Sequence, residues 1–257
     1  MAGMERLSDK TAVGVMTPGM PLYKGVKRQI MDALHRGDWK PGAAIPSEKM
    51  LGERFGVSIG TVRKAVDELT AENLLIRQQG RGTYVASHNR NRQFFYFFHI
   101  VRREDGAKEY PQVELIRFGR GKADPQEALR LNIDRGAGVF RFTNRLSIGG
   151  EPVIVDDITL PERIFSGLTE RSLRQRPSTL YHFYQQAYGV SVVRTEDRLH
   201  AVAASGFQAE VLALEPGAPL LQVERTALSY HDRPVEYRRS CVDTRNYEYF
   251  RDVAGEA

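Results

Sequence analysis

Several polar and basic side chains in residues 47–81 have the types and spacing that suit contacts with a polyanion. Ser58 and Thr61 stand at the expected start of a helix, where hydroxyls and free backbone amides can hold phosphate oxygens. Arg63 follows, and its guanidinium can pair with a guanine edge or clamp a phosphate. These residues predict contacts with double-stranded DNA. The candidate DNA-binding residues are Lys49, Ser58, Thr61, Arg63, Lys64, Gly80 and Arg81.

The surrounding pattern predicts the elements that would position these residues. Apolar residues at helical spacing predict three helices, beginning near residues 22, 48 and 59, and Ser47 and Ser58 are the expected N-caps of the second and third. Two short extended runs flanking the segment Gly80-Arg81-Gly82 then predict a β-hairpin. Two helices joined by a tight turn place the second helix in the major groove, and the hairpin tip suits a wing whose arginine reaches the minor groove.

Residues 21–86 resemble the winged helix-turn-helix of the GntR family. In that family the residues at the positions of Lys49, Ser58, Thr61, Arg63 and Gly80 contact DNA. The family often has arginine at the positions of Lys49 and Ile59, so the resemblance implies that one usual base contact and one bidentate contact are absent here. The resemblance is carried by Pro41-Gly42, Ile45-Pro46-Ser47-Glu48-Lys49, Phe55-Gly56-Val57-Ser58, Thr61-Val62-Arg63-Lys64-Ala65, Leu69, Leu74 and Gly80-Arg81-Gly82-Thr83-Tyr84-Val85.

The distribution of charge along the chain agrees with a basic DNA-binding part. Residues 1–93 hold 15 Lys and Arg against 9 Asp and Glu, whereas residues 94–257 hold 22 against 23. The net charge of +5 therefore comes from the first third of the chain, which suggests a polyanionic partner for that part. We expect a mobile arm at 1–20, a DNA-binding domain at 21–86, a linker at 87–93 and a second domain at 94–257.

The second domain is predicted to be an antiparallel sheet built from a repeated unit. The run Phe94-Phe95-Tyr96-Phe97-Phe98 is interpreted as a buried strand, and residues 113–119 as another. A short helix, a turn, a strand, a hairpin turn and a second strand occur twice, around Gly136 and Gly217, about 80 residues apart. This repeat predicts helices on one face of the sheet and a cleft between two related halves. The overall fold class is therefore α+β.

Residues 94–257 resemble the UTRA domain, the effector module of the HutC-like branch of the GntR family, whose fold is similar to that of chorismate lyase and which usually supports homodimers. The resemblance rests on Thr179-Leu180-Tyr181, Tyr188-Gly189, Glu196, Leu199, Ala201, Leu212-Ala213-Leu214, Gly217-Ala218-Pro219-Leu220-Leu221, Arg225 and Pro234-Val235-Glu236-Tyr237. It implies a pocket for small acidic or phosphorylated metabolites. Arginine suits such ligands, because its planar fork of donors matches a carboxylate or a phosphate. The effector-binding residues that it implies are Arg141, Arg145, Asp156, Ser178, Glu236 and Tyr247. Alternatively, Arg141 and Arg145 form structural ion pairs, for example with Asp156 and Asp157.

Several classes of protein are disfavoured. No stretch approaches the roughly 18 apolar residues of a membrane span, and no secretory signal core is present, so a cytoplasmic location is expected. A single cysteine, Cys241, allows no internal disulfide and suits a small buried residue. The six histidines show no metal-ligand spacing, so neither a metal nor a cofactor is expected.

These patterns favour an effector-responsive transcriptional regulator that binds operator DNA as a homodimer, with repression released by the effector. The sign of regulation stays open, and activation is an alternative. A lyase-like enzyme tethered to DNA is another, although the chain lacks familiar nucleophile-base sets and phosphate loops. A constitutive architectural DNA-binding protein with an inert second domain is the third.

Overall fold

The computed structural model describes residues 19–88, 91–176 and 179–251, and the chain divides into two compact units, residues 1–86 and 87–257. The arm expected at 1–20 falls almost entirely outside the described residues. Within the described part of the chain, no helix is long and apolar enough to cross a membrane. Each unit has its own buried core and is described here by itself.

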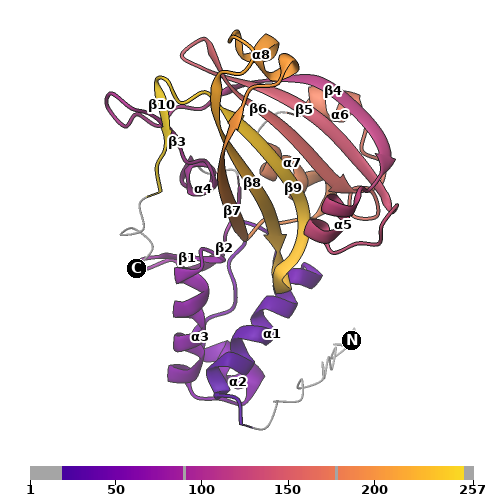
Figure 1. Cartoon of the computed structure of the whole chain (residues 1–257). Coiled ribbons are helices and arrows are strands. Elements are labelled where there is room, and N and C mark those ends of the chain that lie inside the picture. Colours follow the sequence, from indigo (N-terminus) through magenta and orange to yellow (C-terminus); the bar gives the residue numbers. More distant parts are fainter. Residues whose placement is uncertain (1–18, 89–90, 177–178, 252–257) are drawn as a thin grey trace. The chain divides into compact units, whose positions relative to one another are not determined.

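The first unit contains three helices followed by a two-stranded antiparallel hairpin, as the sequence predicted (Figure 1). Val26 and Ile30 of the first helix and Val62 and Leu69 of the third are fully buried, so the apolar stripes of these helices form the core. The elements are α1 (Leu22–Arg36), α2 (Glu48–Phe55), α3 (Ile59–Ala71), β1 (Leu75–Gln78) and β2 (Gly82–Val85).

The second unit is built on a six-stranded antiparallel sheet with the strand order β4-β5-β6-β9-β8-β7, and β3 and β10 form a separate two-stranded sheet (Figure 1). The elements are α4 (Asn91–Phe97), β3 (Ile100–Arg102), β4 (Gln112–Lys122), α5 (Pro125–Leu131), β5 (Gly138–Ile148), β6 (Glu151–Pro161), α6 (Glu170–Arg174), α7 (Leu180–Tyr188), β7 (Arg194–Ala203), α8 (Gly206–Leu212), β8 (Pro219–Ser229) and β9 (Arg233–Val242), with β10 at Tyr247–Tyr249.

The predicted repeat is present as α5-β5-β6 and α8-β8-β9. The two copies join where β6 pairs with β9 in the middle of the sheet, from Ile154 opposite Val242 to Thr159 opposite Tyr237. Each repeat helix packs on a strand of the other copy, α5 on β9 and α8 on β6. The repeat therefore produces one continuous sheet, and the helix of each copy covers a strand of the other copy.

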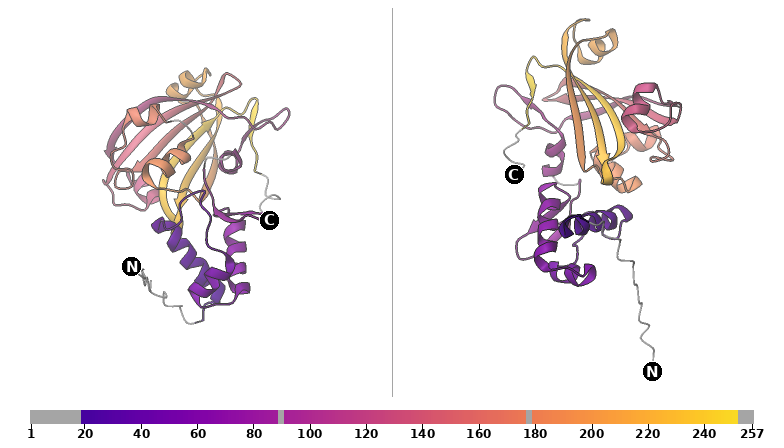
Figure 2. Two further views of the ribbon diagram at one scale, coloured as in Figure 1. Left: turned by 180° about the vertical axis from the view of Figure 1, so that it is seen from behind. Right: turned by 60° about the horizontal axis from the view of Figure 1, so that its bottom comes forward.

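The repeat helices α5 and α8 lie on one face of this sheet, as the repeat predicted. The helix α7 covers the other face, so the prediction of helices on one face alone was wrong (Figure 2). One face carries Phe142 and Ile158, which pack in the largest apolar cluster with Tyr184 of α7. The other face carries Val155, which packs against Leu212 of α8. Because side chains alternate along a strand, β5 and β6 each supply apolar residues to both layers.

The strand predicted at residues 94–98 was also wrong, because Asn91–Phe97 form the helix α4. An apolar run of five residues does not distinguish a strand from a short helix, and the helical form places Phe94 and Phe98 one turn apart with their rings stacked, 5.0 Å between centroids. The start of the linker expected at 87–93 is also packed rather than exposed. Ser87 and His88 are each 7% exposed and form part of the second unit.

Candidate functional sites

The N-terminus of α3 presents the two hydroxyl groups that the sequence singled out. Ser58 caps the helix, with its Oγ accepting from the backbone N–H of Thr61 at 3.2 Å and lying 2.9 Å from the Thr61 hydroxyl. Ser58 and the following Ile59 are exposed. The cap contributes about 1 kcal/mol to the helix and leaves the remaining first-turn amides available for an anion.

Arg63 and Glu48 form an ion pair between α3 and α2. Arg63 Nε donates to Glu48 Oε2 at 2.9 Å, and Arg77 of β1 donates to Glu48 Oε1 at 2.9 Å. The side chain of Arg63 is still 60% exposed, so its remaining donors face solvent. Lys64 is exposed, with its ammonium 4.1 Å from the ring centroid of Tyr23. Glu48 thus orients Arg63 before any ligand arrives.

The hairpin tip depends on glycine for its conformation. Gly80 and Gly82 have φ angles of 71° and 109°, in the region that side-chain-bearing residues rarely adopt. Arg81 between them is exposed, and its backbone N–H donates to the Gln78 carbonyl at 2.9 Å, which closes the turn. Lys49 is exposed in the first turn of α2. All seven candidate DNA-binding residues lie on helix starts, α3 or the hairpin tip.

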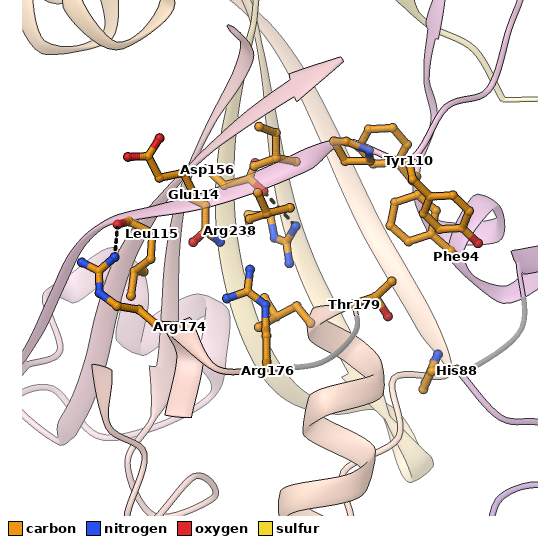
Figure 3. Close-up of a pocket in the computed structure, with 16 residues that line it drawn as sticks. His88, Phe94, Tyr110, Glu114, Leu115, Asp156, Arg174, Arg176, Thr179 and Arg238 are labelled. Atoms are coloured by element: carbon orange, nitrogen blue, oxygen red, sulfur yellow. Dashed lines mark hydrogen bonds and ion pairs between the residues drawn. The ribbon is translucent and has the colours of Figure 1, made fainter. Parts of the chain in front are cut away.

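The second unit contains a cavity of about 680 Å³, within the size range of small-molecule sites (Figure 3). Strands β4, β5, β6 and β9 form one side of it, and α4, the end of α6 and the start of α7 contribute the others. It is lined by His88, Phe94, Phe98, Tyr110, Pro111, Val113, Glu114, Leu115, Asn144, Leu146, Asp156, Arg174, Arg176, Thr179, Leu180 and Arg238.

One part of this cavity is cationic. Arg174, the last residue of α6, and Arg176, two residues later, line it (Figure 3). Arg174 donates to Glu170 and to the Leu115 carbonyl, whereas Arg176 donates only to the Leu173 carbonyl, and no carboxylate of the described residues pairs with it. Burial, together with the positive charge of Arg238, lowers the pKa of Arg176. An anion in the cavity would compensate this charge.

Asn144 adds a second unsatisfied group to the same cavity. Its side chain lies on the wall formed by β5, and the residue is only 2% exposed. Its Oδ1 has no hydrogen-bond partner in the described part of the chain. A buried amide oxygen without a partner costs roughly 1–3 kcal/mol. A ligand would remove that cost by donating a hydrogen bond once the Asn144 side chain turns its oxygen toward the cavity.

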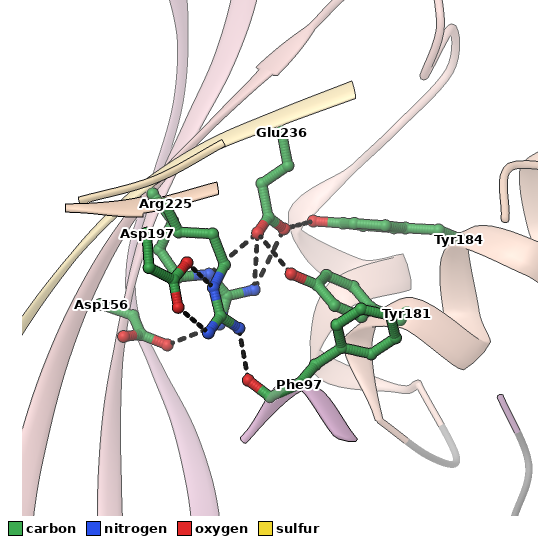
Figure 4. A network of polar contacts seen from close by, with 8 residues as sticks. Phe97, Asp156, Tyr181, Tyr184, Asp197, Arg225 and Glu236 are labelled. Carbon is green, nitrogen blue, oxygen red and sulfur yellow. Dashed lines mark hydrogen bonds and ion pairs between the residues drawn. The ribbon is translucent and has the colours of Figure 1, made fainter. Parts of the chain in front are cut away.

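A network of buried charges lies behind the cavity (Figure 4). Arg238 donates to Asp156 at 3.0 Å and to both oxygens of Glu236 at 2.9 and 3.0 Å. The hydroxyls of Tyr181 and Tyr184 on α7 also donate to Glu236, at 3.2 and 2.6 Å. Burial raises the pKa of Asp156 although Arg238 opposes that shift. The network ties the β9 wall of the cavity to α7.

A second pair extends this network to α4. Arg225 on β8 donates to both oxygens of Asp197 at 2.8 and 2.7 Å and to the Phe97 carbonyl at 2.6 Å. Arg225 is opposite Arg238 in the strand register. Their two positive charges are therefore neighbours, and Asp197 and Glu236 compensate them separately.

The structure brings only some of the sequence-predicted effector residues to the cavity. Asp156 lines it, and the fully buried Glu236 lies behind it through Arg238. Ser178 is outside the described residues. Tyr247 lies in a different hollow, beside Arg102 and Arg245, and donates to the Ile148 carbonyl.

Arg141 and Arg145 do not lie in this cavity, contrary to expectation. Both lie on the sheet face opposite Asn144 and Asp156, because they occupy alternate positions of β5. Arg141 pairs with Glu127 of α5 and Arg145 pairs with Glu114 of β4, so the predicted ion pairs with Asp156 and Asp157 are replaced by others. Burial opposes ionisation of Glu127, but hydrogen bonds from Arg141, the Asp124 backbone and Thr159 together outweigh it and lower the Glu127 pKa.

Sequence reasoning missed the cavity residues Asn144, Arg174, Arg176 and Arg238. Two of them, Arg174 and Arg176, left a pattern in the sequence: two arginines separated by one residue stand just before the helix expected at 180–188. Arg238 and Asn144 had none, since each stands in a strand whose two faces could not be assigned from periodicity alone.

The architecture of each unit agrees with comparisons to known families. Residues 22–85 match the family described as bacterial regulatory proteins, gntR family, and residues 107–248 match the UTRA domain. The chain belongs to the GntR family of bacterial regulators and carries a UTRA domain. It thus combines a DNA-binding domain with an effector-binding domain.

Similar proteins are transcriptional regulators, not enzymes. The chain is 28% identical over 214 residues to the "Probable fructoselysine utilization operon transcriptional repressor" of Escherichia coli strain K12, covering 83% of this chain and 87% of that one. It is also 28% identical over 214 residues to the histidine utilization repressor of Pseudomonas aeruginosa, covering 81% and 82%. The ligand-binding domain of a Bordetella bronchiseptica GntR-family regulator superposes with a TM-score of 0.59 at 35% identity, covering 61% of this chain and 97% of that domain.

Proposed function

We propose that this GntR-UTRA regulator is a repressor that binds operator DNA as a homodimer and leaves it when a small anionic metabolite enters the cavity of the second unit. The observation that carries the effector part is that one cavity is lined by Arg176, which pairs with no carboxylate of the described residues, and by Asn144, whose Oδ1 has no partner among them. The names of the E. coli and P. aeruginosa relatives support repression rather than activation.

For the DNA contacts we propose the start of α3 and the hairpin tip. Ser58, Thr61 and the free amides of α3 would hold a phosphate, Arg63 would contact a base edge or a phosphate, and Arg81 would enter the minor groove. Lys49 and Lys64 would add phosphate contacts, and Gly80 would let the tip approach the backbone. The exposure of Arg63 and Arg81 supports this assignment.

For the effector contacts we propose Arg174 and Arg176 for the anion and Asn144 for a hydrogen-bond donor, with Asp156 and Arg238 as the polar wall. An arginine fork binds carboxylate or phosphate with parallel hydrogen bonds. Arg141, Arg145 and Tyr247 are left out of this site, because the first two are on the other face and the third lies in a separate hollow.

The DNA part is tested by fluorescence anisotropy on the DNA just upstream of the protein's own gene, across a salt series. We expect selective binding that weakens with salt and that Arg63→Ala reduces by about 10- to 100-fold. Arg36→Ala is the matched control, because Arg36 is exposed at the end of α1 and pairs with Asp38 just beyond the helix. If wild type binds this DNA no better than scrambled DNA, selection from a random pool decides, and an empty pool rejects the proposal.

The effector part is tested on the same complex with a panel of small carboxylates and phosphate esters. A true effector should lower operator affinity by about 5- to 150-fold, the usual range of such coupling. Arg176→Gln should abolish release by the effector without changing operator affinity. The control is Arg171→Gln, at an exposed position outside the cavity, which should leave release by the effector intact. A reporter gene under the same DNA distinguishes repression from activation.

A further inference from the structure

The cavity has an aromatic part that an anion site does not use. Phe94 of α4 and Phe98, the residue after the helix, line it together with Tyr110. The Phe94 ring lies 5.0 Å from Phe98 and 4.6 Å from Tyr110, centroid to centroid. Tyr110 is 46% exposed although it packs against these rings. Figure 3 shows the rings of Phe94 and Tyr110 on the side of the cavity away from Arg174.

The helix α4 also supplies the ring of Phe97 to the apolar core, so different rings serve core packing and the cavity lining. Phe97 is 5% exposed and meets Tyr181 edge-on at 5.3 Å within the main apolar cluster. Phe94 and Phe98 are half-buried and face the cavity instead. Core packing therefore accounts for Phe97 but leaves part of the Phe94 and Tyr110 surfaces in contact with solvent, where a ligand would gain by covering them.

The polar groups of the cavity define the rest of a ligand. Arg176 supplies a positive charge without a carboxylate partner in the described residues, and Asn144 supplies a buried oxygen that needs a donor. The residues Phe94, Asn144 and Arg176 all line one cavity of about 680 Å³. A single small molecule of that size can satisfy all three kinds of group.

We propose that the effector is an anion that carries a flat, unsaturated ring and a hydrogen-bond donor. Its carboxylate or phosphate binds Arg176 and Arg174, its donor binds Asn144 Oδ1 after that side chain turns toward the cavity, and its ring stacks on Phe94 and Tyr110. This proposal rests on the proposed effector function of the cavity and narrows its ligand class. Offset stacking between the ligand ring and these side chains provides the selectivity over a saturated ring.

Isothermal titration of the full chain with matched phosphate esters tests the ring. We expect phenyl phosphate to bind about tenfold more tightly than glucose 6-phosphate or inorganic phosphate, and about threefold more tightly than cyclohexyl phosphate, which has the same anion without a flat ring. Phenylacetate in the same series distinguishes a carboxylate from a phosphate as the preferred anion. Equal affinities for phenyl phosphate, cyclohexyl phosphate and glucose 6-phosphate would overturn the proposal.

Substitutions in the aromatic part provide the second readout. Tyr110→Leu should weaken phenyl phosphate about fivefold to tenfold and leave inorganic phosphate unchanged, because it removes a ring but no charge. Phe94→Leu should do the same, while Phe250→Leu, an exposed ring outside the cavity, should have no effect. Because Tyr110 is 46% exposed and Phe94 is half-buried, the Tyr110 variant keeps the test informative if Phe94→Leu does not fold.

The two proposals fail in different ways. If anions bind, depend on Arg176 and do not distinguish flat from saturated rings, only the ring proposal is rejected. If no compound of the series binds, and Arg176→Gln does not alter operator release by any anion of the panel, the effector pocket itself is rejected. The ring proposal is then rejected with it.

Discussion

Gln185 Oε1 accepts a hydrogen bond from the backbone N–H of His88 at 3.2 Å. The same oxygen accepts from the Ser87 hydroxyl at 3.4 Å, and Gln185 Nε2 donates to Ser191 Oγ at 2.9 Å. Gln185 follows Tyr184 on α7, and Tyr184 donates to Glu236, the partner of the cavity residue Arg238. A chain of contacts within the second unit therefore connects the cavity to the segment that immediately follows the DNA-binding unit.

Gln185→Leu is predicted to loosen this segment. It leaves a buried amide and hydroxyl without an acceptor, which costs roughly 1–3 kcal/mol locally. Hydrogen exchange at the amide of His88 should accelerate by about 5- to 100-fold, while amides of the central strands β6 and β9 should keep their protection. Gln186→Leu, the exposed neighbour, is the control. Unchanged exchange at His88 would show that Gln185 does not anchor the segment.

The buried ion pairs are predicted to contribute far more than the exposed ones. Glu236→Ala leaves Arg238 and two tyrosine hydroxyls without their shared acceptor, and it should lower the free energy of unfolding by about 3–5 kcal/mol. Arg194→Ala, which removes two exposed pairs with Glu196 and Asp232, should cost less than about 1 kcal/mol. Urea titration followed by circular dichroism compares the two, and similar losses would contradict the assignment.

Stability is predicted to fall in acid through His88. Burial, and then the nearby His182, lower the pKa of His88 from 6.5 to about 4. Because the folded pKa is depressed, the unfolded chain takes up a proton first as the pH falls below 6.5, so the stability contribution is intact at pH 7 and is lost toward pH 4. The loss should be roughly 3 kcal/mol. His88→Asn should remove this component of the pH dependence, and an unchanged slope would refute it.

Glu48→Gln is predicted to reduce DNA selectivity. Glu48 holds both Arg63 and Arg77 at 2.9 Å, whereas Arg77 also pairs with Asp67. Loss of Glu48 therefore frees Arg63, leaves Arg77 paired, and removes one negative charge near the proposed phosphate contacts. Affinity for scrambled DNA should rise a few-fold, while affinity for the operator should rise less because Arg63 is no longer oriented. The ratio of the two affinities, measured by anisotropy at one salt concentration, should therefore fall. A constant ratio would show that Glu48 does not orient Arg63.

The local elements of the first unit could be read from the sequence, because their signals are local. Ser47 and Ser58 cap helices where predicted, and Gly56 ends α2 in the left-handed conformation. The internal repeat also predicted the paired strands of the second unit, since turn residues and alternating apolar positions recur in both copies. These features depend on interactions between residues close in sequence.

Long-range packing decided the rest. The run at residues 94–98 is helical because its rings pack against Tyr110 and Tyr181, which lie 12 and more residues away in the chain. Arg141 and Asn144 differ by three positions on β5 and face opposite sides of the sheet, and only the pairing of β5 with β4 and β6 assigns those sides. Sequence alone therefore established a DNA-binding unit joined to a sheet domain, whereas the tertiary structure decided which arginines reach the cavity.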